Sequence, residues 1–292
     1  MVNFLLYLWT IIIIRLNNKK KKMNPVYTHP MKQNGESHML KHRLFNLPFR
    51  LLIVGASQRS GKTNRVANLL LKKEPNGYRG LFEGDNIYIF SPSANTDKKI
   101  KTIIEQLDIP SSNIFLEYEE STLMALYEIL EDQFNDALSN DEEPPRSLIF
   151  LDDMSFSGAL KARNFGAISK LFCNGRHINL STIVTSQKYT DIATVCRENA
   201  TGCIFFSCSD KQLEQISEDH NYTGNKKKLS TIFRKVTNER HNAFIVNYDN
   251  VLGEGLYMND KYIPIDKQFK QNVQDLLNVD LETKTDGLNS EQ

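Results

Sequence analysis

Residues 51–63 read LLIVGASQRSGKT, and this stretch decides the fold. The four apolar residues 51–54 predict a short strand that is buried on both faces of a parallel sheet. Residues 56–63 then match the phosphate-binding loop pattern, with Ala56 at the first position, where Gly is commoner. Apolar residues recur at helical spacing after the loop. A strand before the loop and a helix after it are the context that this pattern requires.

The residue types in this loop have a chemical reason. Small residues let consecutive backbone N–H groups point inward and surround a triphosphate, and a glycine before the lysine adopts a conformation that a side chain would hinder. The lysine supplies a positive charge to the β- and γ-phosphates, and the threonine hydroxyl can bind Mg²⁺. We therefore predict a nucleotide and Mg²⁺ site. Its loop residues are Ala56, Ser57, Gln58, Arg59, Ser60, Gly61, Lys62 and Thr63.

A second motif follows about 90 residues downstream. Residues 147–151 predict another buried strand, and Asp152 and Asp153 come directly after it. The strand end can place Asp152 on Mg²⁺, directly or through water, while Asp153 orients and deprotonates the attacking water. A β-branched strand predicted at residues 180–187 ends in Gln187, which can sense the γ-phosphate or that water. An acidic strand end at this distance from the loop, in an alternating β/α chain, strengthens the prediction of a nucleotide site.

Composition leaves the partner class open. The chain of 292 residues has a net charge of +1, but residues 1–22 hold five basic and no acidic side chains, leaving 31 basic against 35 acidic elsewhere. Bulk charge therefore neither indicates nor excludes a nucleic-acid binder. Six basic residues within 226–240 fit a solvated helix face, the interpretation that we favour, or a nucleic-acid contact. Four cysteines without a CxxC pair argue against a disulfide framework.

We expect three parts along the chain. Residues 1–46 form an N-terminal extension, in which the apolar run 4–14 is too short for a bilayer span of about 20 residues. Three interpretations of residues 1–22 are open. We favour an over-extended gene start, with Met23 as the true initiator. The other two are a membrane-surface anchor with a basic flank and a strand-like extension. We do not expect the membrane as a partner. Residues 47–250 form the ATPase domain, and residues 251–292 form a hairpin or helix with a polar tail.

Strand and helix patterns alternate along the central part. We predict a mostly parallel sheet flanked by helices, with a capping box of Ser209 and Gln212 at the start of one helix. The expected strands cover residues 51–54, 86–90, 114–116, 147–151, 180–187, 204–206 and 243–246. The expected helices follow residue 63 and cover residues 121–138, 160–172, 209–219, 226–240 and 266–277.

The order of these motifs resembles the additional-strand P-loop ATPases. Residues 174–177 (NGRH), the strand that runs from Ser181 to Gln187, and residues 197–199 (REN) are similar to the viral DNA-packaging ATPases of the FtsK–HerA superfamily. That group includes the poxvirus type and ATPases of other large DNA viruses, virophages and related elements. The resemblance covers residues 49–247. The phosphate loop is generic, whereas the arginine, serine and glutamine elements are more specific.

The resemblance implies an α/β, RecA-like ATPase that uses ATP and Mg²⁺ to package double-stranded DNA into viral capsids. It implies a homo-oligomeric ring, capsid proteins as partners, and a place in the virion or at the virus assembly site. Members complete each active site with an arginine from the neighbouring subunit, for which Arg176 and Arg197 are the candidates. Many translocases of the superfamily have Glu where Asp153 stands, and the shorter side chain of Asp153 must lie closer to the attacking water.

The position of each arginine along the chain favours Arg176. It precedes the Gln187 strand, and a strand of about seven residues spans roughly 23 Å, too far to reach its own γ-phosphate. Arg197 follows the strand and is expected nearer its own active site. Two other functions stay open: another P-loop motor, helicase-like or conjugation-type, and a scaffold protein that binds ATP and turns over slowly.

Overall fold

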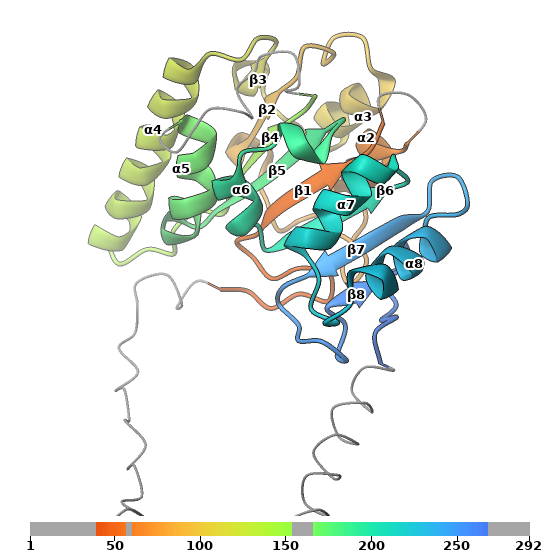
Figure 1. Ribbon diagram of the computed structural model, residues 1–292. Coiled ribbons are helices and arrows are strands. Elements are labelled where there is room, and N and C mark those ends of the chain that lie inside the picture. The colour runs from red at the N-terminus through yellow and green to blue at the C-terminus, as the bar shows by residue number, and fades with distance from the viewer. Residues whose placement is uncertain (1–38, 57–59, 154–165, 268–292) are drawn as a thin grey trace, which may run out of the picture. The chain divides into compact units, whose positions relative to one another are not determined.

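Eight strands form one sheet with helices on both faces within residues 39–56, 60–153 and 166–267, the part of the chain that this computed structural model describes (Figure 1). The strands are β1 (Arg50–Val54), β2 (Ile87–Phe90), β3 (Ile114–Phe115), β4 (Ser147–Leu151), β5 (Leu180–Ser186), β6 (Gly202–Phe206), β7 (Ala243–Asn247) and β8 (Tyr257–Met258). The α-helices are α2 (Lys62–Leu71), α3 (Lys98–Gln106), α4 (Glu120–Ser139), α5 (Ala167–Asn174), α6 (Thr194–Glu198), α7 (Asp210–Asp219) and α8 (Lys226–Val236). Short 3₁₀ turns are η1 (Gly84–Asn86), η2 (Ser111–Asn113), η5 (Gly175–Ile178) and η6 (Tyr189–Asp191).

The strand order in the sheet is β3-β2-β4-β5-β1-β6-β7-β8. Strands β1 to β6 pair in parallel, and β7 and β8 join the far edge as antiparallel strands. The strand that precedes the phosphate loop, β1, lies between β5 and β6, and β5 separates it from the acidic strand β4. The predicted α/β fold with a mostly parallel, helix-flanked sheet is confirmed.

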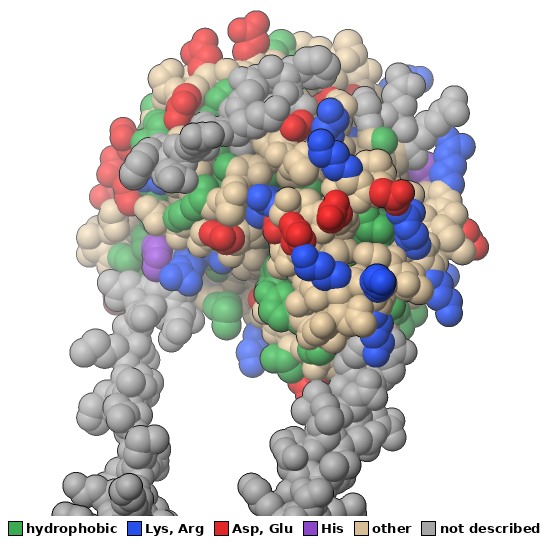
Figure 2. Space-filling model, viewed as in Figure 1, with side chains coloured by type: hydrophobic (Ala, Val, Ile, Leu, Met, Phe, Trp, Pro, Cys, Tyr) green, Lys and Arg blue, Asp and Glu red, His purple; other side chains and the backbone are tan. Residues whose placement is uncertain are grey.

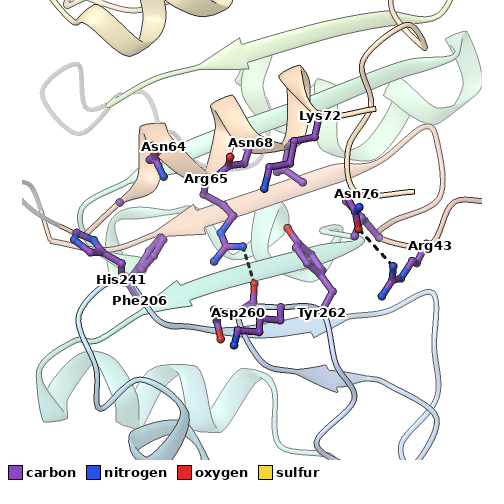
Figure 3. A pocket seen from close by; sticks show the side chains of 14 residues that line it. Arg43, Asn64, Arg65, Asn68, Lys72, Asn76, Phe206, His241, Asp260 and Tyr262 are labelled. Carbon is purple, nitrogen blue, oxygen red and sulfur yellow. Dashed lines mark hydrogen bonds between the residues drawn. The ribbon is translucent and has the colours of Figure 1, made fainter. Parts of the chain in front are cut away.

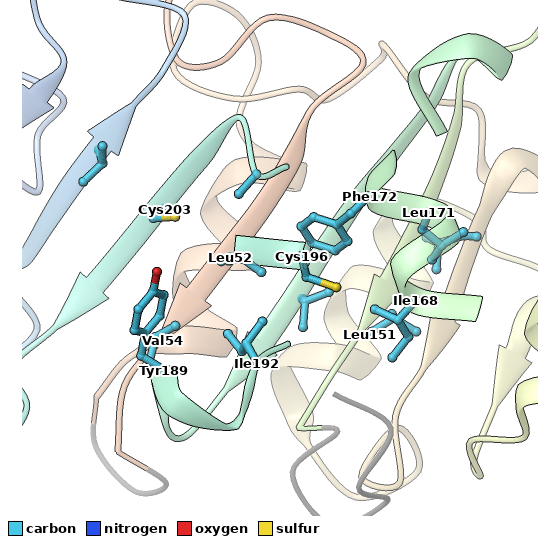
Figure 4. Packing of buried hydrophobic residues seen from close by; sticks show 14 of the residues in the cluster. Leu52, Val54, Leu151, Ile168, Leu171, Phe172, Tyr189, Ile192, Cys196 and Cys203 are labelled. Carbon is cyan, nitrogen blue, oxygen red and sulfur yellow. The ribbon is translucent and has the colours of Figure 1, made fainter. Parts of the chain in front are cut away.

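Both faces of the central strands are buried, which explains their uninterrupted apolar sequences. Alternate residues of β1 point into different cores: Leu52 and Val54 pack with α4 to α8, whereas Leu51 and Ile53 pack with α2 and α3. Figure 4 shows the first of these cores, where Leu52 and Val54 lie among side chains of neighbouring strands and helices. Helices therefore cover both faces of the sheet, and the polar loops lie at its edges.

Several expected elements differ from the structure. Helix α3 is absent from the prediction, although Asp97 caps its start by accepting a hydrogen bond from the Lys99 backbone N–H at 2.7 Å. The predicted capping box of Ser209 and Gln212 is wrong, because the Ser209 side chain makes no capping hydrogen bond. Gln212 instead binds the turn after β5, where its Oε1 accepts from the Tyr189 N–H at 2.8 Å. Gln212 thus forms a tertiary hydrogen bond in place of the predicted local capping box.

The chain before residue 47 takes part in the core, which corrects the expected boundary of the extension. Leu44 and Phe45 are 2% and 0% exposed, and Leu40 forms a β-bridge with Leu47. The Phe45 ring lies so close to β6 that a Cβ on Gly202 would meet it at 2.3 Å. Residues 40–46 are mostly polar, yet the adjacent side chains of Leu44 and Phe45 are buried like core residues.

The C-terminal segment also belongs to the sheet. Strand β8, which the sequence did not predict, pairs antiparallel with β7, and the Asp266 carboxylate accepts backbone hydrogen bonds from Gly253, Gly255 and Tyr257. The helix predicted at residues 266–277 lies almost wholly outside the described residues. In the part that the structure describes, every helix is too short or too polar to cross a bilayer.

Candidate active site

The phosphate loop brings a buried ammonium group to the end of β1. Lys62 is 7% exposed, and its Nζ donates to the carbonyl oxygens of Gly55 at 2.8 Å and Ala56 at 3.1 Å. Gly61, just before it, has a φ of 100°, a conformation that favours glycine. Burial lowers the pKa of Lys62, and the nearby Asp153 and Asp152 carboxylates oppose this effect. Ser57, Gln58 and Arg59 of the predicted loop lie outside the described residues.

Asp152 is held by hydroxyl groups from two neighbouring strands. Its carboxylate is 4% exposed and accepts from Thr185 Oγ at 2.8 Å, in β5, and from Ser91 Oγ at 3.0 Å, directly after β2. Burial raises the pKa of Asp152, whereas the two hydroxyl hydrogen bonds lower it. The remaining lone pairs of such a carboxylate are suited to a hard cation such as Mg²⁺.

Asp153 and Gln187 are in direct contact. The Gln187 Nε2 donates to Asp153 Oδ1 at 2.9 Å and to Oδ2 at 3.1 Å, so the amide spans both carboxylate oxygens. The Asp153 backbone N–H donates to Thr185 Oγ at 2.9 Å, and its φ of 49° turns the chain sharply after β4. Two residues predicted to face the attacking water therefore lie together at the carboxyl ends of adjacent parallel strands.

A hollow of about 460 Å³ lies above the loop. Ser60, Gly61 and Thr63 line it, together with Lys99 from α3 and His241 from the turn before β7. Asp97, Lys99 and His241 at this hollow were not predicted from the sequence, and neither were Ser91 and Thr185, which donate to Asp152. Only Ser91 had a local signal, because it ends a predicted strand at a turn.

The segment after Gln187 is fixed by a polar network. Tyr189 is fully buried, and its hydroxyl donates to Asp219 Oδ2 at 2.7 Å and shares a hydrogen bond with His220 Nε2 at 2.9 Å. His220 also contacts the Tyr248 hydroxyl. Burial lowers the pKa of His220 to about 4, so the imidazole is neutral at pH 7. This network anchors the turn that carries Gln187 to helix α7.

Among the described residues, neither candidate arginine contacts Asp152 or Asp153. Arg176 is exposed in η5, before the first residue of β5, whereas Gln187 follows the last. Arg197 forms an ion pair with Asp219 and lies over the Tyr189 ring at 4.9 Å. Tyr189 is two residues after Gln187, so Arg197 contacts the segment that follows the Gln187 strand, whereas Arg176 lies before that strand. Helix α6 runs back toward the edge where the strands begin.

The hydrogen bond that fixes this direction joins the end of α6 to the start of β1. Asn199, which follows the helix, accepts through its carbonyl oxygen from Arg50 Nε at 2.7 Å, and Arg50 is the first residue of β1. This bond places the end of α6 at the edge of the sheet where β1 begins.

The basic side chains of α8 do not form a uniformly positive surface. Lys226 pairs with Glu218 at 2.8 Å, and Arg234 pairs with Asp210; both acids come from α7. Lys and Arg side chains are interspersed with Asp and Glu over these two helices (Figure 2). The contacts fit the solvated helix face that the sequence favours.

Comparisons with known proteins identify the family. The family model described as "Poxvirus A32 protein" matches residues 36–283. The DNA packaging protein OPG160 of Variola virus is 26% identical over 251 residues, which cover 84% of each chain, and that of Monkeypox virus is 25% identical and covered to 76%. Among solved structures, the genome packaging NTPase B204 from Sulfolobus turreted icosahedral virus 2, in complex with AMPPCP, is 13% identical. Its TM-score is 0.46, with 69% of this chain and 93% of that chain covered. This chain belongs to the poxvirus A32 protein family.

Proposed function

We propose that this chain is a Mg²⁺-dependent ATPase that translocates double-stranded DNA into a viral capsid. The observation that carries the proposal is the match over 84% of both chains to a relative named as a DNA packaging protein. The site geometry supports the chemical half of it. A buried ammonium, two carboxylates and a carboxamide converge at one edge of a parallel sheet, where ligands of open α/β sheets bind.

Lys62 and the loop amides would hold the β- and γ-phosphates, and Thr63 and Asp152 would hold Mg²⁺. The Asp152 carboxylate fits a cation, because two hydroxyls fix its orientation and its burial disfavours an uncompensated negative charge. Mg²⁺, when bound, neutralises negative charge on the phosphate oxygens. The Lys62 ammonium, which hydrogen-bonds loop carbonyls in this structure, has the charge and position to bind a phosphate group.

Asp153 is proposed as the group that accepts a proton from the attacking water. Its carboxylate is half-buried and held at both oxygens by the Gln187 amide, which limits its rotation. A carboxylate whose direction is fixed before reaction loses less entropy on reaching the water. Gln187 would thus act on the chemistry in two ways: it orients Asp153 and, at the strand tip, lies where a terminal phosphate is expected.

The remaining parts of the proposal concern assembly. We infer a homo-oligomeric ring that binds double-stranded DNA and capsid proteins at the site of virion assembly, with Arg176 reaching the active site of a neighbouring subunit. The exposed position of Arg176, at the edge of the sheet away from its own acidic pair, supports action on a second copy rather than within its own chain.

DNA-stimulated turnover tests the motor. ATP hydrolysis with Mg²⁺ is expected to rise when double-stranded DNA is added, and the protein is expected to displace a triplex-forming strand ahead of it without separating the duplex. Strand separation would indicate a helicase, and hydrolysis that does not respond to DNA would indicate an ATP-binding assembly protein. Asp153→Asn serves as the control, because it retains the shape of the site without the proton acceptor.

A further inference from the structure

Helix α7 holds the turn that follows Gln187. The Tyr189 backbone N–H donates to Gln212 Oε1 at 2.8 Å, and the Thr190 N–H donates to the same oxygen at 3.3 Å. Gln212 Nε2 donates in turn to Thr190 Oγ1 at 3.0 Å. One carboxamide of α7 therefore makes three hydrogen bonds to two consecutive residues of this turn.

The chain between Gln187 and these contacts is short and is itself restrained. Only Lys188 separates Gln187 from Tyr189, and the Ser186 hydroxyl donates to the Lys188 carbonyl oxygen at 2.9 Å. The Lys188 N–H donates back to Ser186 Oγ at 3.3 Å. Ser186 is the last residue of β5 and is fully buried. The backbone of Gln187 is therefore fixed between the end of β5 and the Gln212 contact.

The strand order makes this contact a bridge over the strand that carries the phosphate loop. Strand β1 lies between β5 and β6, and α7 follows β6. The Tyr189 ring packs edge-to-face on Phe205 of β6, with ring centres 5.3 Å apart, and belongs to the same buried cluster as Val54, the last residue of β1 (Figure 4). Gln212 thus joins the segments that follow the two strands on either side of β1.

The β6 side of this bridge contacts the phosphate loop. Phe206, the last residue of β6, lies beside the start of α2 (Figure 3), and a Cβ on Gly61 would lie 3.5 Å from its ring. A Cβ on Gly55 would meet the Phe206 Cβ at 2.9 Å. Helix α7 begins at Asp210, soon after this contact. The segment that carries Gln212 is therefore positioned against the phosphate loop.

We propose that Gln212 is a positioning residue for ATP hydrolysis: by holding the turn after β5, it keeps the Gln187 amide on both carboxylate oxygens of Asp153. The inference rests on the roles of Asp153 and Gln187 proposed above. Gln212 is half-buried, and its hydrogen bonds go to the turn, so it acts on Asp153 through Gln187. A misplacement of about 1 Å at a reacting group can lower a rate about 10²-fold.

Gln212→Met keeps the length of the side chain and removes its donor and its acceptor. Hydrolysis of MgATP by the full chain is expected to lose about 10- to 100-fold in kcat, while KM for ATP stays within about twofold, because the phosphate loop is untouched. Gln212→Glu keeps an oxygen for both N–H groups and should retain kcat within about threefold. Gln133→Met, on the exposed face of α4, is the matched control and should change neither constant.

A double-substitution cycle separates positioning from a general structural effect. In Gln187→Ala the amide that Gln212 positions is gone, so adding Gln212→Met should lower kcat by less than about twofold. An equal loss in both backgrounds would show that Gln212 acts independently of Gln187 and would overturn the proposal. Thr190→Val removes one of the three hydrogen bonds at an exposed position and should lower kcat about two- to tenfold. If Gln212→Met does not fold, unchanged kcat in Thr190→Val overturns the proposal instead.

The outcomes distinguish this inference from the proposed function. If the wild-type protein does not hydrolyse ATP, the proposed function is wrong, and the positioning role is refuted with it. If Gln187→Ala hydrolyses ATP at the wild-type rate, the role of Gln187 is wrong, and Gln212 has nothing to position. If Gln187→Ala loses turnover while Gln212→Met keeps the wild-type kcat, only the positioning role is refuted.

Discussion

Thr185→Val removes one hydroxyl that supports both acids of the site. Thr185 is fully buried in β5, donates to Asp152 Oδ1 at 2.8 Å and accepts from the Asp153 N–H at 2.9 Å. Valine has a similar shape and can do neither. A hydrogen bond to a charged group contributes about 1.5–3 kcal/mol, and a buried N–H left unpaired costs about 1–3 kcal/mol. Since the Asp153 N–H is only half-buried, we expect the free energy of unfolding to fall by about 2–4 kcal/mol at pH 7.

This loss should depend on pH with a definite sign. Burial raises the pKa of Asp152 in the folded protein, and the Thr185 hydroxyl partly opposes this, so the variant raises the pKa further. An acid whose folded pKa lies above its unfolded value makes its full stabilising contribution below the unfolded pKa. It loses that contribution as pH rises through the folded pKa. The difference in stability between wild type and Thr185→Val is therefore expected to shrink as pH falls from 7 toward 4.

Urea unfolding at several pH values measures this difference, with Thr185→Ser as the control that keeps the hydroxyl and loses a methyl group. The Mg²⁺ concentration for half-maximal ATP hydrolysis should also rise in Thr185→Val, because Asp152 is less readily ionised. If Thr185→Val and Thr185→Ser were equally stable at pH 7, and the difference from wild type did not change with pH, the hydroxyl would not support Asp152 in this way.

Four further outcomes are expected. Lys62→Ala should abolish ATP hydrolysis and weaken nucleotide binding, and Lys62→Arg should not restore them fully, because the guanidinium is larger and differently hydrated; unchanged turnover would contradict the loop assignment. Asp153→Asn should retain ATP and react about 10²–10⁴-fold more slowly in single-turnover assays, and normal chemistry there, with loss in Asp152→Asn, would reverse the two roles. A chain that starts at Met23 should hydrolyse ATP and assemble normally; failure of either would show that residues 1–22 are required. Arg176→Ala subunits mixed with Lys62→Ala subunits should recover partial activity, and mixed oligomers without recovery would exclude action in trans.

The parts of the fold that sequence could predict are those governed by local pattern. Unbroken apolar runs predicted β1 and β4, because strands buried on both faces carry no polar alternation. The polar residues after these strands followed from one geometric rule: the carboxyl ends of parallel strands meet at one edge of a sheet. Local pattern was thus sufficient to expect Asp153 and Gln187 near each other, and they are in contact.

The contacts that could not be predicted from the sequence depend on pairing between segments that are distant along the chain. Thr185 reads as an ordinary β-branched strand residue, and only the register of β4 against β5 brings its hydroxyl to Asp152. Phe45 lies in a polar stretch, and its burial depends on the close approach that Gly202 permits. Gln212 matched a local capping box but binds a turn 23 residues away. Hydrophobic periodicity contains no information on such contacts.

The contacts of the two arginines favour Arg176 over Arg197 as the group offered to a neighbouring subunit. Arg197 is half-buried, and its ion pair with Asp219 and its position over Tyr189 hold it in its own chain. Its release would expose a carboxylate that also accepts from the Tyr189 hydroxyl, within the network that anchors the Gln187 turn. Arg176 is exposed, and within the described residues its side chain makes a long hydrogen bond, from Nε to the adjacent His177 at 3.3 Å. Moving Arg176 to an anionic partner therefore breaks less of the structure, which is why the mixing experiment is built on Arg176.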